Sequence, residues 1–155
     1  EMGKAGGERA LIGAGTVWTA ADVAAVARVG GRLIVSPNAD PDVIGATVKA
    51  GLQSWPGVLT PTDCFAALKA GATGLKVFPA FQMGIAGLKA IRAVLPYETQ
   101  VFMVGGVDHT GFAEWVAAGA SGFGLGSSLY GPGMSVEDCA ARANETVAAW
   151  DEIQK

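Results

Sequence analysis

The sequence has few charged residues, and it contains no long run of basic, acidic or apolar residues. Charged residues make up 16% and hydrophobic residues 50% of the 155 positions, which excludes a disordered chain. The net charge is -3, and no basic run or basic-aromatic alternation suggests nucleic-acid binding. No apolar run approaches the length of a membrane span. What is left is a globular chain, which we expect to form a single domain over residues 1–155.

Cysteine and histidine are also scarce. Cys64 and Cys139 lie in separate stretches expected to be helical, and we expect reduced thiols rather than a disulfide. His109, the only histidine, is interpreted as a solvated loop residue rather than a catalytic one. No group of His, Asp and Glu has metal-ligand spacing, which disfavours a metal-dependent enzyme. Residues 1–9 are polar and glycine-rich, unlike a secretory signal, and with reduced thiols they suggest a cytoplasmic protein.

One pattern recurs along the chain. A short apolar run ends in Gly, Pro, Ser or Thr, and an alanine-rich helical stretch follows. Such runs are typical of strands buried on both faces of a parallel sheet. The predicted strands are residues 10–15, 32–36, 57–60, 74–78, 101–104 and 122–125. These six βα units indicate an α/β fold, either an open six-stranded sheet or a (β/α)8 TIM barrel with about six of its eight units represented.

Polar residues before the alanine-rich stretches predict where helices begin. The predicted N-terminal signals are Thr19, Asp40 and Thr62. Glycines after these stretches predict left-handed C-caps, and we assign them structural roles only. They are Gly30, Gly51, Gly71 and Gly119.

Lys76 is the most unusual residue, because it has apolar neighbours on both sides within a predicted buried strand. Burial lowers the pKa of a lysine and frees its neutral amine to attack a carbonyl. The alternative is an edge-strand lysine whose amine reaches solvent. The segment alone does not decide between them.

Two glycine-rich strand ends follow, at residues 104–107 and 124–128. Glycine lets the backbone approach a ligand closely, and its N–H groups can cradle an anion. In barrels, the loops after strands 7 and 8 often bind phosphate. Ordinary tight βα turns are the alternative, although a lysine in the preceding strand favours a site. At a third polar strand end, Thr16 either donates to a substrate carboxylate or caps the next helix, and capping is favoured without further context.

Taken in order, these motifs resemble the KDPG/KHG aldolase family over nearly the whole chain. They are residues 13–17, 36–38, 56–57, 76–79, 104–107 and 124–127. The resemblance is nearest to the branch acting on 2-dehydro-3-deoxy-6-phosphogalactonate. It implies a (β/α)8 barrel, a homotrimer, and a class I (Schiff-base) aldolase that releases pyruvate and D-glyceraldehyde 3-phosphate. It implies neither a metal nor an organic cofactor.

The resemblance also implies roles for individual residues. Lys76 forms the Schiff base. Thr16, Pro37 and Phe78 hold or line the pyruvate end. The phosphate is bound by Gly105, Gly106, Gly126 and Ser127. Val104 stands where gluconate-type enzymes usually carry Thr, which favours the galacto configuration or relaxes the choice.

The family pattern has two further βα units before Gly13, which supply an Arg for the carboxylate and a Glu for proton transfer. Neither motif is present in this sequence, and Glu1 and Glu8 are not assigned the role. We therefore expect the 155-residue chain alone to be an incompetent aldolase. Three alternatives stay open: a gluco-specific KDPG-type aldolase, a phosphosugar isomerase or epimerase on the same barrel, and a non-catalytic fragment.

Overall fold

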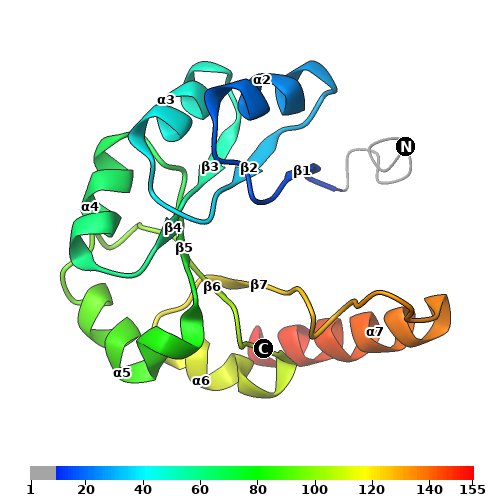
Figure 1. Cartoon of the computed structure of the whole chain (residues 1–155). Coiled ribbons are helices and arrows are strands. Elements are labelled where there is room, and N and C mark those ends of the chain that lie inside the picture. The colour runs from blue at the N-terminus through cyan, green and yellow to red at the C-terminus, as the bar shows by residue number, and fades with distance from the viewer. Residues whose placement is uncertain (1–9) are drawn as a thin grey trace. The chain divides into compact units, whose positions relative to one another are not determined.

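The computed structural model describes residues 10–155, and its residues group into two compact units (Figure 1). Unit 1 runs through Lys76 and also includes Tyr97–Gln100. Unit 2 comprises Val77–Pro96 and Val101–Lys155. The chain passes from the first unit to the second within strand β5 (Leu75–Val77).

Unit 1 contains a parallel three-stranded sheet in the order β1-β2-β3. Its strands are β1 (Gly13–Ala14), β2 (Leu33–Val35) and β3 (Gln53–Trp55). A short strand β4 (Gly57–Val58) follows directly. Beside it, the Lys76 N–H donates to the Pro56 carbonyl at 3.0 Å, which fixes the start of β5 in this unit.

Helices follow these strands, and their start signals explain their bounds. They are α2 (Ala20–Arg28), α3 (Pro41–Lys49) and α4 (Pro61–Lys69). The predicted caps Thr19 and Asp40 are confirmed, since each side chain accepts from backbone N–H groups of the first turn. The predicted start at Thr62 is wrong, because Thr60 caps α4 and forms a reciprocal capping box with Asp63.

Each predicted range contains a strand, and one further strand, β3, was not predicted. Strand β3 precedes Pro56, where Gln53 and Ser54 look too polar for a buried strand. Ser54 is nevertheless buried, and its backbone N–H is satisfied because it donates to Thr73 Oγ1 at 2.9 Å. The four predicted C-cap glycines all have left-handed φ values, between 73° and 105°. Unit 1 is filled by a core cluster of Val17, Val23, Ile34 and Val43.

Unit 2 pairs two parallel strands, with Val104 opposite Gly124. The strands are β6 (Val101–Val104) and β7 (Gly122–Gly124). The helices are α5 (Ala80–Arg92), the 3₁₀ turn η2 (His109–Gly111), α6 (Phe112–Ala117) and α7 (Val136–Ile153). No helix in residues 10–155 is both long and apolar enough to cross a bilayer.

Aromatic rings join α7 to strand β7 and helix α6. The rings of Phe112 and Phe123 stack with centroids 4.0 Å apart. Trp150 meets both of them edge-on, at 6.3 Å and 6.0 Å. Because Phe123 belongs to β7, this cluster sets the position of α7 relative to the end of that strand.

Candidate active site

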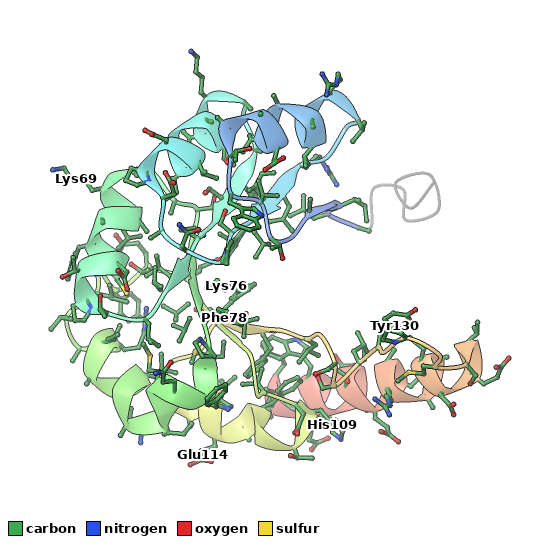
Figure 2. All side chains as sticks on the ribbon, in the orientation of Figure 1. Lys69, Lys76, Phe78, His109, Glu114 and Tyr130 are labelled. Carbon is green, nitrogen blue, oxygen red and sulfur yellow. The ribbon has the colours of Figure 1, made fainter. Side chains whose placement is uncertain are left out.

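Lys76 lies in the middle of β5, between two fully buried neighbours, Leu75 and Val77. Its own side chain is half-buried, and burial lowers the pKa of its amine below the usual value of 10.5. Figure 2 labels it together with Lys69, which is exposed and extends away from the end of α4. Lys76 therefore differs from an ordinary surface lysine in the direction that favours a nucleophile.

Thr16 and Pro37 also belong to unit 1, where each follows the carboxyl end of a parallel strand. Thr16 has a left-handed backbone, with φ 57°, which an L-residue rarely adopts. The next residue ties this turn to β2, since the Val17 N–H donates to the Val35 carbonyl at 3.2 Å. The interpretation of Thr16 as a helix cap is wrong, because Thr19 caps α2. Its hydroxyl is not used at that helix start.

The remaining predicted site residues gather around one cavity in unit 2. The cavity has a volume of about 490 Å³. Its lining includes six of the predicted residues: Phe78, Val104, Gly105, Gly106, Gly126 and Ser127. The pairing of β6 with β7 explains the convergence, because parallel strands end at the same edge. The structure thus brings the two glycine-rich strand ends together.

Glycine is required where β6 ends. Gly105 and Gly106 have φ values of 92° and 73°, and a Cβ on Gly106 would lie 3.0 Å from the Phe81 ring. The Gly105 carbonyl accepts from the Phe81 N–H at 3.3 Å, which holds the turn against α5. Within the described chain, the Gly106 N–H has no acceptor in the protein.

The end of β7 also leaves backbone N–H groups without partners in the described chain, because the chain forms a single helical turn there. The Gly126 carbonyl accepts from the N–H groups of Leu129 and Tyr130, at 2.9 Å and 3.0 Å, and so closes one helical turn. The first N–H groups of such a turn have no partner inside it. Those of Ser127 and Ser128 find no acceptor elsewhere in residues 10–155. Both residues line the cavity, so backbone donors from two strand ends are available to an anion there.

Sequence reasoning missed Asp108 as a lining residue, whereas Ser128 lies within the predicted strand end 124–128. Asp108 caps η2, and its Oδ1 accepts from the Thr110 N–H at 2.9 Å and the Thr110 hydroxyl at 2.6 Å. These hydrogen bonds hold the pKa of the exposed carboxyl below its usual range. The Asp-x-Thr spacing was the available signal. His109, in the following turn, does not line the cavity.

Neither cysteine takes part in a disulfide, as expected. Burial, with a smaller contribution from the neighbouring Asp63 charge, raises the pKa of the Cys64 thiol to about 11. Among the residues that the structure describes, no three His, Cys, Asp or Glu side chains are grouped as a metal site would require. Glu1 and Glu8 lie outside the described residues.

Comparison with known proteins connects this geometry to a family. The model for KDPG and KHG aldolases matches residues 3–143. A probable 2-dehydro-3-deoxy-6-phosphogalactonate aldolase of Rhizobium meliloti (strain 1021) is 54% identical over 143 residues, which cover 92% of this chain and 68% of that protein. The chain belongs to the KDPG and KHG aldolase family.

Two further members extend the comparison. The 2-dehydro-3-deoxy-6-phosphogalactonate aldolase of Escherichia coli (strain K12) is 48% identical over 146 residues, 94% of this chain and 71% of that one. A solved structure described as "Native KDPGal structure" superimposes with a TM-score of 0.95 at 47% identity, covering 98% of this chain and 74% of that chain. The predicted fold class is thereby confirmed: the chain has the α/β fold of the KDPG and KHG aldolase TIM barrels and represents part of that barrel.

Proposed function

We propose that this family member acts as a class I aldolase, cleaving 2-dehydro-3-deoxy-6-phosphogalactonate to pyruvate and D-glyceraldehyde 3-phosphate. One observation carries the proposal: Lys76 is half-buried in β5, and burial lowers its pKa. A neutral amine is what Schiff-base formation needs. The names of the Rhizobium and Escherichia relatives supply the substrate.

The reaction starts at the Lys76 amine. It attacks the C2 ketone to give a carbinolamine, which loses water and becomes an iminium ion. The iminium accepts the electron pair of the C3–C4 bond as that bond breaks, while the C4 hydroxyl gives its proton to a general base and becomes the aldehyde of glyceraldehyde 3-phosphate. The family resemblance assigns this proton transfer to a Glu whose motif is not in this sequence. The resulting enamine takes a proton at C3 from the same acid-base group. Hydrolysis then releases pyruvate and returns the amine.

The other site residues orient the substrate. Gly105, Gly106, Gly126 and Ser127 bind the phosphate through the cavity of unit 2. Thr16 donates to the pyruvate carboxylate, and Pro37 and Phe78 line the walls around the reacting carbons. Val104 places methyl groups rather than a hydroxyl in the cavity wall, which fits a galacto substrate. Holding the two ends of the substrate converts binding energy into alignment of the reacting atoms.

Trapping with pyruvate and borohydride tests the nucleophile. In the complete protein, reduction of the Schiff base should add one pyruvate-derived mass, which peptide mapping should place on Lys76. Lys76→Ala should abolish the adduct, whereas Lys69→Ala removes an exposed lysine and should leave it unchanged. An adduct that persists in Lys76→Ala would refute the assignment. Phosphate binding without any adduct would instead favour a phosphosugar isomerase or epimerase.

The family resemblance also supports three broader proposals: a homotrimer, a cytoplasmic location, and catalysis without a metal or organic cofactor. Sedimentation equilibrium tests the first, and fractionation of the source cells tests the second. Turnover that is unchanged after dialysis against a chelator would support the third.

A further inference from the structure

The phosphate cavity poses an electrostatic problem. A phosphate ester carries a charge of about -1.5 to -2 near neutral pH. Asp108 is the only charged residue in the described lining, and it is negative. No lysine or arginine of the described chain lines the cavity, so the anion would be held by backbone N–H groups and serine hydroxyls beside a carboxylate.

A guanidinium nevertheless contacts one residue of this lining. Arg142 projects from α7, and its Nη1 donates to the Ser128 carbonyl at 3.5 Å. Ser128 itself lines the cavity. The link spans elements separate in the sequence, because Ser128 follows β7 and Arg142 lies in the interior of α7.

The turn that contains Ser128 explains how this contact acts on the cavity. The Gly126 carbonyl closes the turn, leaving the N–H groups of Ser127 and Ser128 open at its beginning. Aligned peptide units are positive at their N–H end and negative at their carbonyl end. A cation on the Ser128 carbonyl therefore stabilises the turn from its negative end and strengthens the donors at its positive end.

Helix α7, which carries Arg142, is held in place by aromatic contacts. The contacts of Trp150 with Phe112 and Phe123 position α7 against β7, the strand that leads into the turn. We infer that Arg142 is a positioning residue for phosphate recognition. Through the Ser128 carbonyl it holds the Gly126–Tyr130 turn with its donors available, and it supplies the positive charge that the cavity lining lacks.

This inference rests on the proposed function, because it assigns a phosphorylated substrate to the cavity. The test compares Arg142→Gln and Arg142→Lys in the intact protein, with Arg28→Gln as a control that removes one exposed arginine from α2 in unit 1. Steady-state kinetics with the phosphorylated keto acid and its dephosphorylated analogue give kcat and KM. Inhibition by inorganic phosphate is measured at low and high salt.

Arg142→Gln should raise KM for the phosphorylated substrate, and Ki for phosphate, by roughly 3- to 10-fold, because it removes an exposed charge-assisted hydrogen bond. We expect kcat, and KM for the analogue, to stay within about two-fold, since the reacting carbons are untouched. The effect on Ki should shrink at high salt. Arg142→Lys should recover part of the loss, because it keeps the charge but not the planar fork.

Equal losses on both substrates, or an unchanged Ki for phosphate in Arg142→Gln, would overturn the inference, as would an equal change in Arg28→Gln. Failure of the proposed function shows elsewhere, as absence of the pyruvate adduct in the complete protein with its natural sequence. Phosphate binding followed by ³¹P NMR needs no turnover. It therefore tests Arg142 even if the aldolase assignment is wrong.

Discussion

At the scale of single residues, the protonation of Lys76 has a measurable consequence. Burial lowers its pKa below 10.5, so the free amine is present at a lower pH than for a solvated lysine. The rate of pyruvate trapping should therefore rise with pH through a midpoint below 10.5, measured by quenching with borohydride at intervals. A midpoint at the ordinary lysine value would contradict the effect of burial.

The lowered pKa of Lys76 also makes the stability of the fold depend on pH. The unfolded chain keeps its Lys76 proton up to about pH 10.5, whereas the folded chain releases it earlier. The unfolded state thus binds more protons between the two pKa values, and stability falls as pH decreases through that window. Lys76→Met should remove this part of the pH dependence in urea titrations.

Gly106 should tolerate no side chain. Its φ of 73° is left-handed, and a Cβ would lie 3.0 Å from the Phe81 ring. Gly106→Ala should destabilise the fold by about 1–2 kcal/mol and weaken phosphate inhibition, because the turn that aims its N–H must shift. Gly45→Ala is the matched control, since nothing lies within 4 Å of that position in α3. It should raise stability by up to about 1 kcal/mol. Equal effects in the two variants would argue against a special Gly106 conformation.

The sequence predicted Lys76 and both glycine-rich strand ends because each is locally unusual: a cation in an apolar strand, and two glycines within three residues at the end of a strand. It did not predict Arg142 or the cavity-lining role of Asp108. Arg142 looks like any exposed helix residue, and its contact depends on how α7 packs on β7. A contact that depends on tertiary packing cannot be predicted from the neighbouring residues in the sequence.

At the scale of elements, the start of α4 offers a direct comparison between two threonines. Thr60→Ala removes the capping box with Asp63 and should lower the free energy of unfolding by about 1 kcal/mol. Thr62→Ala changes an exposed residue already inside the helix and should cost less than about 0.5 kcal/mol. Urea denaturation of both variants measures the difference. The opposite ranking would restore Thr62 as the cap.

Element prediction was accurate where composition and periodicity agreed. All six apolar runs contain strands, and the glycines that end the helices have the expected backbone. It failed at β3 and at the start of α4. The buried backbone of Ser54 is satisfied by Thr73, 19 positions away. At α4, Pro61 fits the first helical position, because its missing N–H is not needed there, and this makes Thr60 the cap.

At the scale of the whole molecule, the barrel resemblance predicted the fold better than any count of strands. Six βα units fit an open sheet as well as an incomplete barrel. The superposition on a KDPGal structure, at a TM-score of 0.95, decides for the barrel. Pattern alone does not make that choice, because buried parallel strands look the same in both architectures.

The two units also interleave along the chain. Tyr97–Gln100 belongs to unit 1, although unit 2 flanks it on both sides. Within unit 1, the Gln100 carbonyl accepts from the Leu75 N–H at 2.9 Å, one residue before the nucleophile. A genetic crossover at the Lys76–Val77 peptide would therefore inherit the reactive lysine from one parent and part of its backbone support from the other. For recombination among family members, this boundary is a poor place to exchange gene segments, because the segment whose backbone pairs with β5 lies beyond it in the sequence.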